Sequence, residues 1–106
     1  MEKIEFSDII AERQLVGRQG DQTFAVTVRI GRPVPHPDGD WECPYVISGL
    51  PNPHGLRVGG VDAVQALSLA LRAIGADLQL QRKDIHLQWS GMDDLGFPVP
   101  EVDAPK

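Results

Sequence analysis

One long stretch of this chain carries the apolar spacing of an α-helix, and it limits the fold more than any other feature. From about Val61 to Leu80, apolar residues recur every three or four positions. One stripe with this spacing consists of Val64, Leu67, Leu71, Ile74 and Leu78. Because a single helix cannot enclose its own apolar stripe, we expect this one to lie across a β-sheet.

Most of the chain outside this helix has the residue pattern of β-strands. Phe24, Val26, Val28 and Ile30 alternate with more polar residues, which predicts a strand at 22–30 with one core face. Three further strands are predicted at 9–18, 41–50 and 85–89. Residues 31–40 and 51–60 contain clustered proline and glycine and are predicted as loops.

Two details of these strands stay open in the sequence. In the first strand, either one set of apolar residues faces the core or the other does, and a bulge could reconcile them. The two sets are Ile9, Ala11 and Leu15, and Ile10 and Val16. Pro44 has no backbone N–H to donate, which favours an edge position or a bulge for the 41–50 strand.

These patterns together predict an α+β fold. We expect a small single domain over residues 1–97, of order β-β-β-α-β. Its sheet is mostly antiparallel and four-stranded, with the 41–50 strand at an edge and one long helix packed on one face. Residues 98–106 are predicted to form a flexible, proline-rich acidic tail.

Glycines run directly into the helix, as they do in phosphate-binding loops. Here no lysine follows Gly59 and Gly60, and Asp62 places a carboxylate where the anion would bind. Asp62 and Gln65 instead have the spacing of a helix-capping box. We therefore interpret Gly60, Asp62 and Gln65 as a structural helix start.

A second apolar stripe follows nearly the opposite side of the helix. It consists of Ala66, Leu69, Ala73, Ala76 and Leu80. The helix propensity of alanine explains part of it, but a lone surface helix normally shows water a broad charged face. The C-terminal segment with Leu95 and Phe97, or a second copy of the chain, could cover this stripe. We therefore mark it as an interaction surface.

Net charge argues against several classes of partner. The 106 residues include 15 acidic and 10 basic side chains, for a formal net charge of −5. The basic residues are scattered, whereas binding to phosphate backbones requires a concentrated positive face. We expect no nucleic-acid partner and no membrane partner. The remaining partners are a second copy, as a homodimer, or an unknown protein.

The residues at the start of the chain and the single cysteine bear on localisation. Cys43 is the sole cysteine, so no intrachain disulfide forms and a reducing compartment is the simplest setting. Residues 1–10 lack the pattern of a secretory signal, and no apolar run is long enough to span a bilayer. We expect a cytoplasmic protein.

Residue types alone give little support for catalysis. Cys43 lies on the apolar face of its predicted strand, where a thiol is usually inert, so we do not expect it to act as a nucleophile. A base for it would have to be His36, His54 or His86. The spacing of His36, Cys43 and His54 matches no common zinc site. We therefore predict no catalytic residue, no metal ligand and no cofactor.

One set of polar residues offers a different function. Arg29, Glu42, His86 and Gln88 lie on the faces of their predicted strands that point away from the core. If the helix covers only one side of the sheet, these side chains line an open polar face. That face could bind a small ligand or serve a small enzyme, although an ordinary solvated face explains it too.

Several motifs, taken in order, resemble a known family. They are the Trp-x-Cys strand at Trp41 and Cys43, the Gly-x-Asp-x-x-Gln-Ala-Leu helix start, and the Leu-Gly-Phe-Pro tail. The matching positions are Trp41, Cys43, Gly60, Asp62, Gln65, Ala66, Leu67, Trp89, Leu95, Gly96, Phe97 and Pro98. The chain resembles a family of small, functionally uncharacterised bacterial proteins, a domain of unknown function. This resemblance implies a compact bacterial α+β domain and supplies no activity.

On this basis the expected function is that of a non-enzymatic protein-interaction module. It would bind another protein or a second copy, and an inhibitor-like or immunity-like role suits the small acidic body. The alternative is a small-ligand-binding protein or small enzyme that uses the polar sheet face around His86 and Arg29. A ligand site requires a concave pocket with converging polar groups, whereas an interaction module requires an apolar patch.

Overall fold

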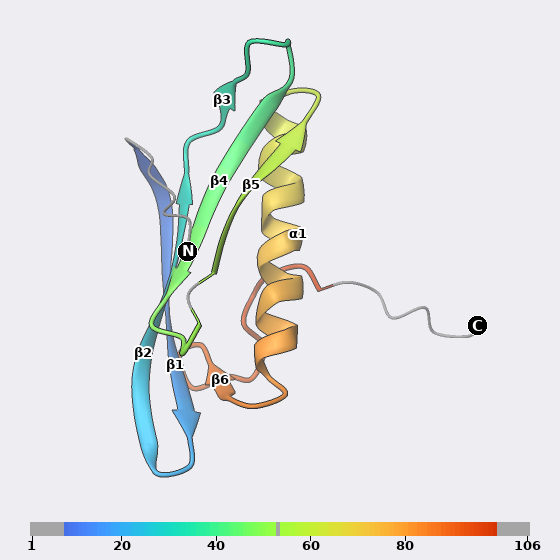
Figure 1. Cartoon of the computed structure of the whole chain (residues 1–106). Helices are drawn as coiled ribbons and strands as arrows, with labels where there is room; N and C mark the ends of the chain where they lie inside the picture. Colours follow the sequence, from blue (N-terminus) through green and yellow to red (C-terminus); the bar gives the residue numbers. More distant parts are fainter. Residues whose placement is uncertain (1–7, 53, 100–106) are drawn as a thin grey trace, which may run out of the picture.

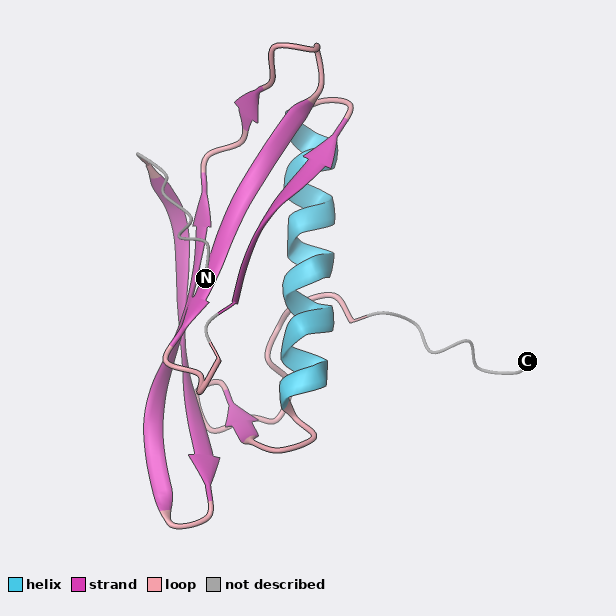
Figure 2. Cartoon of the chain, in the orientation of Figure 1, coloured by secondary structure: helices cyan, strands magenta, loops and turns pink. Residues whose placement is uncertain are grey.

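The computed structural model describes residues 8–52 and 54–99. Its elements in chain order are β1 (Ile9–Gln19), β2 (Gln22–Gly31), β3 (Val34–Pro35), β4 (Trp41–Ser48), β5 (His54–Gly60), α1 (Ala63–Gln81) and β6 (His86–Gln88). The strands form one sheet, and α1 lies along one face of it (Figures 1 and 2). The fold is therefore α+β with one long helix, as expected, but six strands form the sheet where four were predicted.

Two sequence-based expectations concern the ends of the chain and the membrane. Residues 100–106, most of the segment predicted to be a flexible tail, lie outside the described residues. Among the residues that are described, no helix combines the length and hydropathy that a bilayer span requires.

β1 and β2 form a long antiparallel hairpin. The register between them shifts once, between Ile9 and Ala11, as at a bulge. Leu15 is buried, whereas Val16 lies on the opposite face and is half exposed. In β2 the alternation predicts the buried face correctly, because Val26, Val28 and Ile30 are buried.

β5 occupies a segment that we predicted as a loop. Its residues pair in antiparallel register with Trp41–Ile47 of β4. This seven-residue segment contains three glycines, so its own preference for a strand is weak. Pairing with β4 and packing of Val58 against the core make it a strand. The loop prediction is wrong for residues 54–60.

β4 lies inside the sheet, so the edge position expected for it is wrong. β5 pairs with Trp41–Ile47, a stretch that overlaps the residues paired with β2 and those paired with β3. β5 must therefore lie on the other side of β4, as Figure 1 shows. Cys43 and Pro44 fall between the stretches paired with β3 and β2. A missing N–H is tolerated where the ladder is interrupted in this way.

The complete sheet is open and antiparallel throughout its described pairings. Its hydrogen-bonded order is β3-β4-β2-β1-β6, with β5 paired to β4. β6 pairs only with residues 16–18 of β1, which leaves the N-terminal half of β1 without a strand on that side. Within residues 8–52 and 54–99, the sheet thus has two long unpaired edges, along the N-terminal half of β1 and along β5.

The side of α1 that faces the sheet is built from smaller residues than we predicted. Its buried residues are Ala66, Ala70, Ile74, Gly75 and Leu78. Val64, which we assigned to the core stripe, is 76% exposed, and Leu67 and Leu71 are only partly buried. α1 packs over β4 and β5, where Tyr45 and Ile47 already fill the core. Alanines let the helix approach these large side chains closely.

The start of α1 explains the glycines that precede it. Asp62 is the N-cap, and its Oδ1 accepts a hydrogen bond from the Gln65 backbone N at 2.8 Å. Gln65 Oε1 accepts from the Val61 backbone N at 2.7 Å. A β-carbon on Gly60 would lie 2.5 Å from the Ala66 backbone N, so the end of β5 and the first helical turn leave no room for a side chain.

We predict that Gly60→Ala destabilises the protein and that Gly59→Ala does not. Gly60→Ala forces backbone away from backbone, which costs about 1–3 kcal/mol of unfolding free energy. At Gly59 the nearest atom to an added β-carbon is 3.8 Å away, an ordinary contact, so the change should stay within about 0.5 kcal/mol. Urea unfolding followed by circular dichroism measures both. Equal midpoints for the two variants would contradict the packing explanation.

Candidate functional site

The open edge of β5 adjoins an exposed apolar flank of α1. Among the described residues, β5 pairs only with β4, so no described strand lies along its outer side. Beside it lies a groove of about 700 Å³. The groove is lined by Val58, Leu69, Arg72, Ala73, Ala76, Pro98 and Val99. Arg72 is the one charged residue in this lining.

Three leucines make this edge unusually apolar for a solvent-facing surface. Leu56 of β5 is 51% exposed, and Leu69 and Leu80 of α1 are 38% and 58% exposed. We call the set Leu56, Val58, Leu69, Ala73, Ala76 and Leu80 the β5–α1 surface. It contains four of the five residues of the predicted interaction stripe. The fifth, Ala66, is fully buried in the core, because α1 is rotated toward β5 relative to our expectation.

A polar cluster lies between β5 and α1, and our reading of the sequence missed it. The Tyr45 hydroxyl donates a hydrogen bond to Asp77 Oδ2 at 2.5 Å. His54 Nδ1 lies 3.6 Å from Asp77 Oδ1, and Gln81 Nε2 lies 2.9 Å from His54 Nε2. One signal was present, because Asp77 lies three positions after Ile74 and seven after Ala70, on the core face of the helix. A carboxylate there requires partners.

This cluster joins three elements at the base of the β5–α1 surface. Tyr45 belongs to β4, His54 to β5, and Asp77 and Gln81 to α1. These contacts hold β5 against the helix. Burial of Tyr45 raises the pKa of its hydroxyl well above its usual range, and the hydrogen bond to Asp77 and the charge of Asp77 raise this pKa further.

The raised pKa of Tyr45 makes stability depend on alkaline pH. The stabilisation is complete below the ordinary tyrosine pKa of about 10 and is lost as pH rises toward the higher pKa of the folded protein. Tyr45 is the sole tyrosine, so near-ultraviolet phenolate absorbance reports on it alone. We predict that this absorbance appears only together with loss of the circular dichroism signal. Titration near pH 10 in a still-folded protein would contradict this account.

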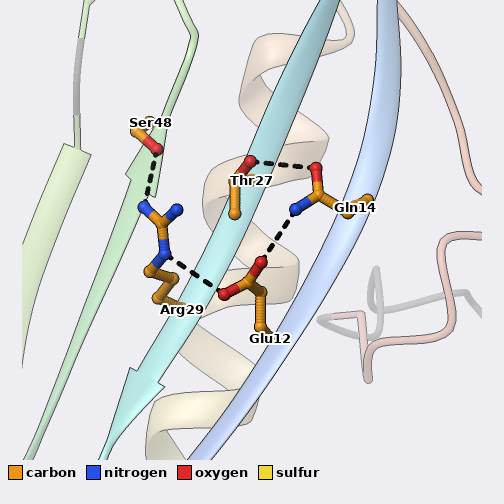
Figure 3. Close-up of polar contacts among 5 residues, drawn as sticks. All are labelled: Glu12, Gln14, Thr27, Arg29 and Ser48. Carbon is orange, nitrogen blue, oxygen red and sulfur yellow. Dashed lines mark hydrogen bonds and ion pairs between the residues drawn. The ribbon is translucent and has the colours of Figure 1, made fainter. Parts of the chain in front are cut away.

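The polar face of the sheet is a flat network of bonded side chains on the side away from α1 (Figure 3). Arg29 Nε lies 3.3 Å from Glu12 Oε1, and Arg29 Nη1 donates to Ser48 Oγ at 3.5 Å. Gln14 Nε2 donates to Glu12 Oε2 at 2.8 Å. Thr27 Oγ1 donates to Gln14 Oε1 at 3.1 Å. These side chains bond to one another across β1, β2 and the end of β4.

The four residues of the predicted ligand face lie in three separate groups. Arg29 belongs to the network just described. Glu42 lies 3.5 Å from Arg57 and 3.8 Å from His36. His86 and Gln88 both approach Asp93 Oδ1, at 3.7 Å and 3.2 Å. The cavity beside His86 holds about 250 Å³, and none of the other three residues lines it.

Cys43 is buried in surroundings that disfavour a nucleophilic role. Its thiol is fully buried and donates a weak hydrogen bond to the Gly31 carbonyl at 3.5 Å. Burial raises the pKa of this thiol, which disfavours the reactive thiolate. In residues 8–52 and 54–99, no group of three or more His, Cys, Asp or Glu side chains is arranged to hold a metal ion.

The C-terminal segment, residues 95–99, packs beside the N-terminal half of β1. The guanidinium of Arg13 lies 3.7 Å from the Trp89 ring centre and 5.0 Å from that of Phe97. Arg13 Nη1 also donates to the Leu95 carbonyl at 3.1 Å. The segment therefore lies beside the N-terminal half of β1, whereas no described segment adds a strand to the outer side of β5.

The same segment crosses α1 at Gly75. A β-carbon at Gly75 would overlap the Pro98 carbonyl oxygen, so the chain passes directly over the helix backbone. Phe97 and Pro98 enclose a cavity of about 280 Å³ with Leu71 of the helix. Leu95 and Phe97 lie on the other flank of the helix, whereas Pro98 and Val99 of the same segment line the groove with Leu69, Ala73 and Ala76.

Comparison with known proteins gives a match to a family model. Neither the curated proteins nor the solved structures include a match to this chain. A family model matches residues 11–99, which include all of α1 and every strand except the start of β1. The chain belongs to the family described as Domain of unknown function (DUF6968).

Proposed function

We propose that this protein is a non-enzymatic interaction module that binds another protein through the β5–α1 surface. The observation that supports this most directly is the position of the open β5 edge beside an exposed apolar helix flank. A partner strand can add to the edge by backbone hydrogen bonds, while the groove accepts apolar side chains. Each element alone is common on protein surfaces, but their adjacency gives one partner both kinds of contact.

The exposed leucines supply the energy for such binding. Full burial of a leucine side chain contributes about 1.5–3 kcal/mol. Leu56, Leu69 and Leu80 are between 38% and 58% exposed, so a partner that covers all three gains roughly 1 kcal/mol from each. The acidic net charge and the lack of a basic patch favour a protein partner over nucleic acid or anionic membrane. The buried free thiol fits a reducing, cytoplasmic setting.

A ligand-binding or enzymatic role on the polar sheet face has weaker support. Arg29 and the residues around it bond to one another, and His86 lies in a different group with Asp93. Converging polar groups in a concave pocket are the usual signature of such a site. The four residues of the predicted ligand face do not converge in this structure.

Site-specific photo-cross-linking in cells that produce the full chain tests the proposal. A photoreactive amino acid at Leu69 should give covalent adducts with a protein, identified by mass spectrometry. The matched control is the same amino acid at Val64, which lies on the same helix and is 76% exposed but points away from β5. Adducts at Leu69 and not at Val64 support the proposal. Identical adduct patterns at both positions, or no protein adduct at Leu69, would refute it.

A further inference from the structure

We propose that the partner at the β5–α1 surface is a second copy of this chain, related by a two-fold axis. In this arrangement the β5 strands of the two copies pair antiparallel, so one sheet runs through both copies. The two α1 helices then lie side by side and antiparallel on the same face. This inference rests on the proposed function, because it names the occupant of the same surface.

The helix flank is complementary to itself under such an axis. Leu69, Ala73, Ala76 and Leu80 have spacings of four, three and four residues, and this sequence of spacings is the same in both directions. An antiparallel copy centred between Ala73 and Ala76 therefore places Leu69 against Leu80 of the second copy. The alanines at the centre are the smallest side chains of the flank, and the second helix would lie there beside Pro98 and Val99, which line the same groove. A two-fold interface needs this property, because the same surface must fit itself.

Because of the way β5 lies along α1, a single two-fold axis can relate both the two β5 strands and the two α1 helices. A β-carbon on Gly60 would contact Ala66, and His54 contacts Asp77 and Gln81. β5 therefore runs antiparallel along the helix. Leu56 is two residues, or about 7 Å, from His54 along the strand. The same distance corresponds to roughly four to five residues of helix. Counted back along α1 from Asp77 and Gln81, which contact His54, this places Leu56 level with Ala73 and Ala76.

A strand register centred on Leu56 is also favourable for the side chains. Each Leu56 then lies opposite its copy on the helix-facing side of the sheet, between the two helices. Arg57 lies opposite Gly55 of the second copy. A register centred on Arg57 would instead place two guanidinium groups directly opposite each other, which is destabilising. The Leu56 register avoids this repulsion.

The available area matches what a small stable dimer requires. α1 has 19 residues and is about 28 Å long. The helix and the sheet edge are two layers about 10 Å apart, so together they present a face roughly 20 Å thick. The face measures roughly 600 Å² per copy, or about 1,200 Å² in total, near the lower limit for a specific interface. A dimer of this size should dissociate on dilution.

Charged substitutions on the two sides of the axis test the arrangement. The measurement is the molar mass of the full chain by analytical ultracentrifugation over a wide concentration range. The wild type should form a dimer that dissociates on dilution. Leu69→Glu and Leu80→Lys should each be monomeric, because each places two charges in the interface. The double variant Leu69→Glu/Leu80→Lys should dimerise again, because the new charges meet only between copies. Val64→Glu should dimerise like the wild type. Circular dichroism establishes that each variant is folded.

Cross-linking gives a second measurement that does not depend on destabilising variants. Residues directly opposite in an antiparallel pair have Cα atoms about 4.5–5.5 Å apart, within disulfide range. Leu56→Cys should therefore form an intermolecular disulfide under mild oxidation, and Val64→Cys should not.

Three results would overturn the inference, and they can be told apart from failure of the proposed function. A wild-type chain that stays monomeric at every concentration overturns self-association. If the Leu69 photo-adduct is then a different protein, the interaction module stands with another partner. Dimers that persist in Leu69→Glu would show that another surface is used. Failure of the double variant to restore the dimer overturns the two-fold antiparallel geometry.

Discussion

Gly49→Ala should lower the free energy of unfolding by about 2–5 kcal/mol, a large part of the total stability of a small protein. Gly49 follows β4 and has a φ of 95°, a left-handed conformation that favours glycine. An alanine β-carbon there would also overlap the Ala25 carbonyl oxygen and lie 3.2 Å from Val26 Cα. Both atoms belong to the backbone of the central strand β2, so the clash cannot be relieved by moving a side chain.

Gly39→Ala is the matched control for this prediction. Gly39 has a φ of 100°, yet no atom lies within 4 Å of the added β-carbon. Its substitution carries the conformational cost alone, about 1–2 kcal/mol. Urea unfolding of both variants separates the two contributions. If both variants lose the same stability, the contact with β2 has no energetic consequence and the steric explanation fails.

Tyr45→Ala should have an effect of about 3–5 kcal/mol on the free energy of unfolding. Tyr45 is fully buried at the centre of β4, so truncation leaves a large cavity. It also removes the hydroxyl that donates to Asp77. Thermal and urea unfolding measure the loss.

Tyr45→Phe separates the ring from the hydroxyl. It keeps the packing and removes one hydrogen bond to a charged group, for which we expect about 1–3 kcal/mol. Asp77 keeps its contact with His54, which limits the loss. A Tyr45→Phe variant as unstable as Tyr45→Ala would show that the polar cluster, and not core packing, dominates at this position.

The parts of the fold that the sequence predicted are those with strong local patterns. The alternation at Val26, Val28 and Ile30 identifies both a strand and its buried face. The helix was predicted from about Val61 to Leu80 and spans Ala63–Gln81, because its apolar spacing is strong and the capping residues Asp62 and Gln65 place its start within two residues. In both places the local preference and the tertiary environment agree.

Predictions failed where long-range contacts override local preference. Gly55, Gly59 and Gly60 make β5 look like a loop, and only pairing with β4 makes it a strand. Pro44 suggested an edge position for β4. The strand is nevertheless inside the sheet, because Pro44 lies between the residues that pair with β3 and those that pair with β2. No local pattern in the sequence reveals that β6 will lie beside β1, since that pairing joins segments distant in the chain.

The orientation of the helix shows a related difficulty. Hydrophobicity alone selected Val64, Leu67 and Leu71 for the core, because leucine and valine exceed alanine in apolar area. The sheet side is already filled by large residues of β4, so Ala66 and Ala70 face it instead. The rotation of α1 about its axis depends on how its side-chain volumes fit those of β4. The helix sequence alone does not contain the volumes on the sheet. The Asp77 cluster follows from the same rotation.

The crossing of Pro98 over Gly75 affects how the protein can be labelled. After this crossing the chain reaches Val99, which lines the groove beside Leu69. A fluorescent protein or affinity tag fused after residue 106 is therefore joined, through seven residues, to a point beside the surface that we assign to binding. Such a fusion should compete with any partner for space, whereas a tag inserted at the exposed Gln19–Gln22 hairpin turn lies at the far end of the sheet. Interaction experiments on this family will depend on that choice of attachment point.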